Sequence, residues 1–145
     1  IAAEIGSMQV TEQIDAMRAL GASPIKKLVT PKILAGMITL PLLTVTADIV
    51  GIFGGMIISL FELDIHRTFY INSVLTTVKM TDFLSGVGKT VFFGFLIAVI
   101  GCYFGLKTTG GTTGVGRSTT ITVVTISILI LISDFFLTKL FLVVF

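Results

Sequence analysis

Charged residues are scarce in this chain, and their scarcity is the first guide to its class. Only 12% of the 145 residues are charged and 54% are hydrophobic, whereas an ordinary soluble domain has roughly 25% charged residues. The mean hydropathy is +1.06, which indicates an integral membrane protein. The formal net charge of +2 is too small to suggest a protein that binds nucleic acid.

Residue types that carry catalysis or hold metals are equally few. The single cysteine, Cys102, lies in an apolar run, so no intrachain disulfide can form. The single histidine, His66, has no second histidine or cysteine nearby, which argues against a metal site. No nucleophile and base have the sequence spacing typical of a catalytic pair. We therefore predict that the chain has no catalytic site and binds no metal or cofactor itself.

Two glycine-rich stretches resemble nucleotide-binding loops but fail on spacing. Gly86-Val-Gly-Lys-Thr90 ends like a P-loop, but the full pattern requires glycine where Phe83 stands. The stretch 110–116 lacks the G-x-G-x-x-G spacing and follows an apolar span, so we expect a flexible cytoplasmic turn there.

Three apolar stretches are long enough to cross a bilayer, which takes about 20 residues as a helix. They cover 33–61, 84–106 and 121–145, and in the second Lys89 would snorkel to the interface. Long runs without two-residue alternation indicate helices rather than barrel strands. We predict an all-α integral membrane protein, a polytopic helical bundle with three transmembrane helices that follows a cytoplasmic segment at 1–32.

The basic residues that flank the spans predict the orientation in the membrane. Segment 1–32 holds four bases, and loop 107–120 holds two more without an acid. Acids balance bases between the first two spans. We therefore expect 1–32 and 107–120 in the cytoplasm and 62–83 outside. Residues 64–80 of the outer segment would form either an interfacial helix or a re-entrant hairpin.

Small and polar residues recur at helical spacing in the first two spans. Such small-xxx-small patterns let helices approach closely, so we expect tight packing within the protein, with a dimer seam as the alternative. The first span carries Thr44, Asp48, Gly51, Gly55 and Ser59, and the second carries Thr90, Gly94, Ala98, Gly101 and Gly105.

Two acids, Asp48 and Asp134, lie deep in their spans. A carboxylate at a helix centre costs about 2.5–3.5 kcal/mol, so each should face a partner or a water-filled cavity. Asp134 cannot easily pair with Lys139 on its own helix, because five residues separate them by about 140°; Lys139 could instead reach Asp48 or snorkel. The acids would line a transport path or titrate protons. The alternative is a structural network with hydrogen bonds from Thr44, Ser133 and Thr138.

The segment before the first span is polar and helix-forming. Between Met8 and Leu20, one predicted helix carries an apolar stripe and a more polar one that includes Glu12 and Asp15. Gly21 suits the position just past a helix end. A helix lying on lipid would favour Lys and Arg on its exposed face, but this face mixes acids with bases. A protein partner is therefore the better interpretation.

Two further signals follow before the membrane. Ser23-Pro24 predicts the start of a short helical turn, with serine as N-cap and proline at the first position. Thr30-Pro31 repeats this signal, so we expect a second sharp break at the membrane entry.

Several stretches taken together resemble the MlaE/YrbE family of ABC-transporter permeases. The resemblance covers essentially the whole chain in order. Residues 12–21 also loosely resemble the EAA loop of ABC importers, although the spacing from Gly21 to Pro31 is shorter. The stretches that carry it are Ala2-Ala3-Glu4-Ile5-Gly6-Ser7-Met8, Thr11-Glu12-Gln13-Ile14-Asp15-Ala16, Leu20-Gly21-Ala22-Ser23-Pro24, Leu40-Pro41-Leu42-Leu43, Gly101-Cys102-Tyr103-Phe104-Gly105, Gly114-Val115-Gly116-Arg117-Ser118-Thr119-Thr120 and Asp134-Phe135-Phe136-Leu137-Thr138.

The resemblance implies a homodimeric permease for phospholipid or related lipids. A separate ATPase subunit would bind ATP and Mg²⁺, and an MCE-domain lipid-binding protein would complete the system. The protein would lie in the bacterial inner membrane, or in the plastid inner envelope of a plant or alga. The chain begins with Ile1 and has no signal sequence, so we interpret it as the C-terminal part of such a permease, without the upstream spans.

The resemblance also implies roles for particular residues. The region 4–20 would be the coupling helix that the ATPase holds, with contacts from Glu4, Glu12, Asp15 and Arg18. Apart from the resemblance, depth in the spans and helical spacing make Asp48, Asp134, Thr44, Gly51 and Gly55 candidates for the lipid path or for packing.

Two other functions remain open at this point. A proton-coupled secondary transporter could titrate Asp48 and Asp134, but it would not need the cytoplasmic helix. A membrane anchor without transport activity would not need the buried acids.

Overall fold

The computed structural model describes residues 1–144, and these form helices joined by short connections. No strand occurs among the described residues, which confirms the predicted all-α fold. Three helices are long and apolar enough to cross a membrane, over Ile25–Phe61, Met80–Leu106 and Gly111–Phe141. The elements in chain order are α1 (Ala2–Val10), α2 (Gln13–Ala19), a π-helical turn (Ile25–Val29), α3 (Thr30–Phe61), α4 (Arg67–Thr77), α5 (Met80–Leu106) and α6 (Gly111–Val144).

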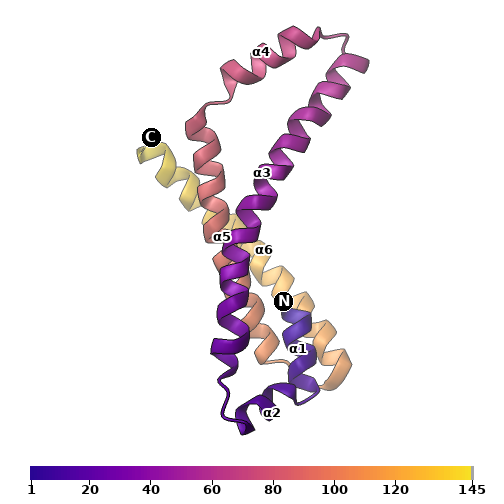
Figure 1. Ribbon diagram of the computed structural model, residues 1–145, viewed down its shortest axis with the longest axis vertical. Coiled ribbons are helices and arrows are strands. Elements are labelled where there is room, and N and C mark those ends of the chain that lie inside the picture. The colour runs from indigo at the N-terminus through magenta and orange to yellow at the C-terminus, as the bar shows by residue number, and fades with distance from the viewer. Residues whose placement is uncertain (145) are drawn as a thin grey trace.

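Helix α5 is the central element of the bundle (Figure 1). It packs against α1, α3 and α6, whereas α3 and α6 do not contact each other within the described residues. The short helices α1 and α2 lie at one end of the molecule, and α4 crosses between α3 and α5 at the other end (Figure 1). Residues 64–80 therefore contain one short helix, not a re-entrant hairpin.

The small residues of α5 form its packing surface, as the sequence predicts. Gly94, Ala98, Gly101 and Gly105 are all buried. A Cβ atom on Gly94 would collide with the carbonyl oxygen of Gly36 in α3. The stripe therefore sets how closely α5 approaches both α3 and α1, because Gly101 and Gly105 lie against residues 1–5.

The corresponding stripe of α3 behaves differently from the expectation of tight packing. A Cβ on Gly51 would meet nothing within 4 Å. Gly55 faces the Tyr70 hydroxyl of α4, which donates a hydrogen bond to the Ile52 carbonyl at 3.1 Å. The reason is geometric: α3 crosses α5 near Gly36 and then diverges from it toward α4 (Figure 1).

The predicted helix between Met8 and Leu20 is two helices. Glu12 adopts a left-handed backbone conformation with φ of 60°, which ends α1 and turns the chain into α2. The end of α2 agrees with the sequence. Gly21 has φ of 73°, its N–H donates to the Arg18 carbonyl, and the Ala22 N–H donates to the Met17 carbonyl, both at 3.0 Å. These two bonds are the Schellman pattern that ends many helices.

The expected break at Thr30-Pro31 does not occur. The Ser23 side chain accepts a bond from the Lys26 N–H at 3.5 Å, as its predicted N-cap role requires, but the helix then continues into α3. Pro31 has no N–H to donate into the preceding turn. The turn widens to a π-helix instead, and the Thr30 hydroxyl donates to the Ile25 carbonyl at 3.2 Å.

The loop expected at 107–120 is much shorter. Gly110 and Gly111 have φ of 90° and 67° and make the turn, after which α6 begins. Helical structure starts early because the Gly114 N–H and the Thr113 hydroxyl both donate to the Gly110 carbonyl. The stretch 111–116 is thus the first turns of a helix rather than a flexible turn.

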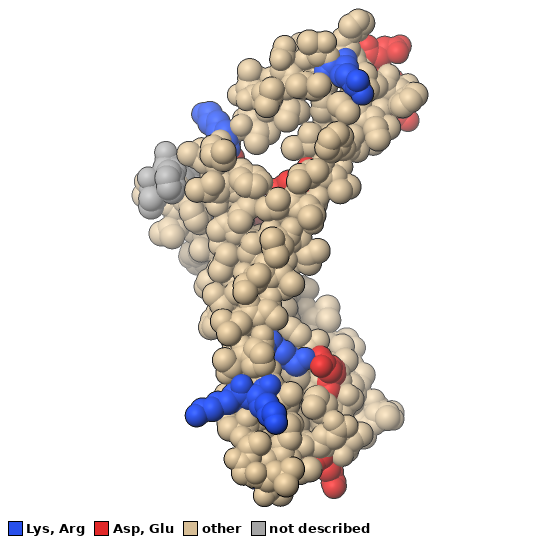
Figure 2. Space-filling model, viewed as in Figure 1, with Lys and Arg blue, Asp and Glu red and all other residues tan. Residues whose placement is uncertain are grey.

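Charged side chains gather toward the two ends of the molecule, with a mainly uncharged waist between them on the face shown in Figure 2. This distribution suits a protein whose ends lie in water and whose middle lies in lipid, because charges in hydrocarbon are costly.

The close contact between α3 and α5 predicts a specific sensitivity to side-chain size. Replacing Gly94 by alanine should lower the free energy of unfolding by about 1–3 kcal/mol, because the methyl group must push apart two backbones. Thermal unfolding of the full-length protein in detergent measures this. Gly86→Ala is the matched control in the same helix, because a Cβ there meets nothing within 4 Å; equal destabilisation by both variants would contradict the packing argument.

Candidate functional site

Helix α2 and the residues around it form a corner at one end of the bundle, which we call the α2 tip (residues 12–25). Ile14 is fully buried and packs in a cluster with Ile5 of α1 and Cys102 of α5. Met17 and Leu28 pack against the same cluster. This buried side chain anchors α2 against α1, in a cluster that α1 shares with α5, and most of the rest of the tip faces outward.

The outward face of the α2 tip carries three of the predicted contact residues. Glu12, Asp15 and Arg18 are all exposed. Arg18 Nη1 donates to Asp15 Oδ1 at 2.7 Å, and both side chains are more than half exposed. Since exposed ion pairs contribute little to stability, these charges remain available to a partner.

Two apolar side chains on the same tip were not singled out by the sequence. Leu20 is 84% exposed and Ile25 is 62% exposed, on either side of the Gly21–Pro24 break. Large exposed apolar residues beside charges are typical of a protein-contact surface. In the sequence, only their position beside the helix-ending Gly21 and the Ser23-Pro24 turn could have predicted their exposure. The helical pattern alone does not distinguish them from buried apolar residues.

Glu4, the fourth predicted contact residue, has a different partner. Its Oε2 atom lies 2.5 Å from Nζ of Lys32, which joins α1 to the start of α3. The hydrogen bond from Lys32, together with its positive charge, lowers the pKa of the Glu4 carboxyl below its ordinary value of 4.5. Glu4 therefore links two helices of this chain.

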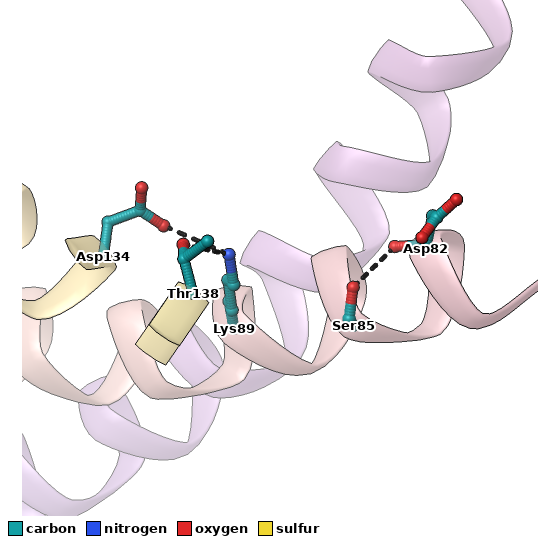
Figure 3. A network of polar contacts seen from close by, with 5 residues as sticks. All are labelled: Asp82, Ser85, Lys89, Asp134 and Thr138. Carbon is teal, nitrogen blue, oxygen red and sulfur yellow. Dashed lines mark hydrogen bonds and ion pairs between the residues drawn. The ribbon is translucent and has the colours of Figure 1, made fainter. Parts of the chain in front are cut away.

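A polar network joins α5 to α6 in the other half of the bundle (Figure 3). Lys89 Nζ donates to Thr138 Oγ1 at 2.6 Å and lies 3.5 Å from Asp134 Oδ1. The Lys89 side chain is only 17% exposed. Asp134 therefore has a cationic partner on a neighbouring helix, and Lys89 forms this contact instead of snorkelling outward as expected.

Asp48 stands apart from this network. It is exposed on α3, and no ion pair involves it within the described residues. Because α3 and α6 do not touch, the fold of one chain does not bring Asp48 together with Asp134. Lys139 does not reach across to Asp48 either: its ammonium lies 5.9 Å from the ring centre of Phe135 on its own helix.

The other lipid-path candidates lie on the same helix as Asp48. The Thr44 hydroxyl donates to the Leu40 carbonyl of its own helix at 2.9 Å, and Gly51 faces open space. Asp48 and Gly51 are therefore exposed on α3 within the described residues, whereas Thr44 is half-buried.

Comparison with known proteins identifies the family. A sequence model described as "Permease MlaE" matches residues 1–140. The chain belongs to the MlaE permease family. This confirms the resemblance inferred from the sequence motifs.

Named relatives agree with this assignment. A "Probable ABC transporter permease protein" of Rickettsia prowazekii is 46% identical over 141 residues, which cover 97% of this chain and 54% of the relative. One of Synechocystis is 47% identical over 136 residues, covering 94% and 52%. "Protein TRIGALACTOSYLDIACYLGLYCEROL 1, chloroplastic" of Arabidopsis thaliana is 41% identical over 140 residues, covering 97% and 40%. The chain spans about half the length of the relatives it matches.

The ion pair between α1 and α3 predicts a pH dependence. The lowered pKa of Glu4 means that the pair stabilises the fold above pH 4.5, and that this contribution is lost as the pH falls through the lowered value. The stability difference between the wild type and Glu4→Gln should be below about 1 kcal/mol at pH 7, because Glu4 is 60% exposed, and should shrink as the pH falls through the lowered pKa.

Thermal unfolding from pH 7 to pH 3 measures this difference. Glu62→Gln, an exposed site at the other end of α3, is the matched control. A Glu4 effect that grows as the pH falls would show that the sign is wrong.

Proposed function

We propose that this chain is the membrane-spanning part of a permease subunit that moves phospholipid or a related lipid between membranes, driven by a separate ATPase subunit. The α2 tip carries the proposal, because it combines exposed charges and exposed apolar side chains on a helix anchored in the bundle. Membership of a family of ABC-transporter permeases supplies the kind of partner.

The connections of the α2 tip suit it to pass on movement. Ile14 lies in one buried cluster with Ile5 and Cys102, and α2 packs on α1, which packs on α5, so a displacement of α2 acts on α1 and through it on α5. On its other side the tip runs through the π-helical turn directly into α3 without a break. An ATPase that holds Glu12, Asp15, Arg18 and the exposed Leu20 would therefore move three helices together.

The remaining surfaces have proposed roles consistent with this arrangement. The exposed face of α3 around Asp48 would meet a second copy of the permease or line the lipid path, and the end with α4 would meet an MCE-domain lipid-binding protein. The α2 tip would lie in the cytoplasm, in a bacterial inner membrane or a plastid inner envelope. A lipid substrate is supported by the Arabidopsis relative, whose printed name contains a galactolipid.

Charge reversal on the α2 tip should uncouple the ATPase. Glu12→Lys and Asp15→Lys should each weaken association of the full-length permease with its ATPase by about tenfold or more, since like charges at an interface cost several kcal/mol. Co-purification from detergent, with ATP hydrolysis as a second readout, measures this. Glu62→Lys makes the same reversal on an exposed site at the other end of α3 and should retain association. Unchanged ATPase binding by both α2 variants would refute the coupling role.

The proton-coupled alternative depends on the two intramembrane acids, Asp48 and Asp134. A titrating pair needs both carboxylates, whereas in this fold Asp48 and Asp134 lie on helices that do not touch. We expect Asp48→Asn to retain ATP-dependent lipid transfer between vesicles, and Asp134→Asn to retain it to at least about a tenth, since asparagine can still accept a hydrogen bond from Lys89. Abolished transfer in both variants, with normal ATPase binding, would favour the proton-coupled alternative.

A further inference from the structure

A polar pocket of about 270 Å³ lies where α5 ends and α6 begins, at the same end of the bundle as α1 and α2 (Figure 1). Two cationic side chains, Lys107 and Arg117, line this pocket, and no acidic side chain does. The sequence contains no acid at all between Asp82 and Asp134. The pocket therefore carries a positive charge that its own lining does not cancel.

Both cations have unused capacity to donate hydrogen bonds. The exposed guanidinium of Arg117 forms no ion pair or hydrogen bond with any residue that the structure describes. The Lys107 ammonium donates one proton to the Tyr103 hydroxyl at 2.5 Å and lies 4.5 Å from the centre of the same ring. An ammonium has three protons to donate and a guanidinium has five N–H groups. Most of the charged donors at this pocket are therefore available to a ligand.

Two hydroxyl groups fix the wall of the pocket. Those of Thr108 and Ser118 both donate to the Phe104 carbonyl at 3.0 Å. That carbonyl belongs to the last turn of α5, where carbonyl groups have no partner within the helix. The bond from Ser118 also holds the beginning of α6 against the end of α5. The two hydroxyl groups are thus used by the fold, and the cations are the groups left for a ligand.

The pocket lies at the boundary between an apolar span and water. The span of α5 ends at the residue before Lys107, and the exposed ring of Tyr103 lies one turn deeper. Tyrosine rings and the charged ends of lysine side chains are typical of the level of the lipid head groups. Ile121, one helical turn beyond Arg117, also lines the pocket and is exposed. The positive charge therefore adjoins an apolar surface that suits acyl chains.

We propose that this pocket binds the phosphate of an anionic phospholipid of the surrounding bilayer, with Lys107 and Arg117 as its ligands and an acyl chain beside Ile121. Basic pockets between membrane helices on the cytoplasmic side are typical sites for anionic head groups. Arginine binds phosphate through paired donors, and lysine binds it as a point charge. The N-terminal end of α6 adds partial positive charge. The bound lipid joins the end of α5 to the beginning of α6.

This lipid is a component of the bilayer held at the surface of the permease, and it differs from the lipid that the proposed function moves. The inference uses the charge and the depth of the pocket and requires no transport activity. An acidic surface of the ATPase is the other ligand that the charge could attract. The exposed apolar side chains of Tyr103 and Ile121 beside the cations fit the edge of a bilayer better than a contact made in water.

Local fluorescence quenching in vesicles tests this assignment. These 145 residues contain no tryptophan, so Ile121→Trp adds a reporter whose emission is the difference from the full-length protein without it. The vesicles hold phosphatidylcholine with a rising share of phosphatidylglycerol that carries bromine on its acyl chains, because bromine quenches tryptophan on contact. Phosphatidylglycerol should bind beside the reporter about tenfold or more tightly than phosphatidylcholine, since each basic residue near anionic lipid contributes roughly fivefold.

Paired variants show whether the two cations cause this preference. Lys107→Gln combined with Arg117→Gln should abolish it. Lys107→Arg combined with Arg117→Lys keeps both charges and should retain it. Equal thermal unfolding midpoints for the two pairs show that the loss is local.

A matched control separates the pocket from general surface charge. Lys26→Gln combined with Lys27→Gln removes two exposed charges at the same end of the molecule and should retain the preference for phosphatidylglycerol. If this pair abolishes the preference as fully as the pair in the pocket does, the attraction belongs to the whole surface and the assignment is wrong.

Three further results would overturn the assignment. Displacement of the brominated lipid from the reporter by millimolar inorganic phosphate would make the pocket a free-anion site. Displacement by the ATPase subunit would make it a protein contact. Loss of the preference only during ATP hydrolysis would place the pocket on the transport path.

The failure of this inference is distinct from that of the proposed function. If the preference is absent while ATP-dependent lipid transfer persists, only the pocket assignment fails. If the preference is present while transfer is absent, the proposed function fails and the pocket assignment stands.

Discussion

The close approach of α5 to its neighbours is the constraint on which the rest of the bundle depends. In lipid the hydrophobic effect does not hold helices together, so packing must come from close van der Waals contact between small residues. Gly94 meets the backbone of α3 at Gly36, and Gly101 and Gly105 meet the first turns of α1. With α1 held there, Ile5 offers the surface against which Ile14 is buried. The exposed α2 tip is therefore positioned by glycines that lie inside the membrane-spanning part of the protein.

Polar groups in the spans divide into those that the fold satisfies and those that it leaves open. Lys89, Asp134 and Thr138 satisfy one another between α5 and α6, which reduces the cost of placing them in a lipid environment. Asp48 has no such partner within the described chain and lies on the open face of α3. This contrast assigns the two acids different environments, although their sequences place them at similar depths. Among the lipid-path candidates, Asp134 therefore lies between two packed helices, whereas Asp48 and Gly51 lie on an exposed face of α3.

Much of the local structure follows from the sequence because its causes are local. Gly21 ends α2 through a left-handed backbone, as its position after Leu20 predicts. The same reasoning was wrong at Thr30-Pro31, where the hydroxyl of Thr30 and a widened π turn accommodate the proline without a break. It was also wrong at 111–116, where threonine and glycine continue as helix once Gly110 and Gly111 have made the turn. Short motifs predict that a backbone irregularity is required, but neighbouring hydrogen bonds decide its form.

The sequence by itself determined the membrane class, the all-α fold, the three long apolar helices and the family, because these depend on composition, on the length of apolar runs and on ordered motifs. Only the tertiary structure decided which residues meet. It joined Glu4 to Lys32 and Asp134 to Lys89, exposed Leu20 beside the charges of the α2 tip, and kept Asp48 apart from Asp134. The physical reason is that helical periodicity fixes which residues share a face, whereas the crossing points of helices, set here by Gly36 and Gly94, decide which faces come into contact.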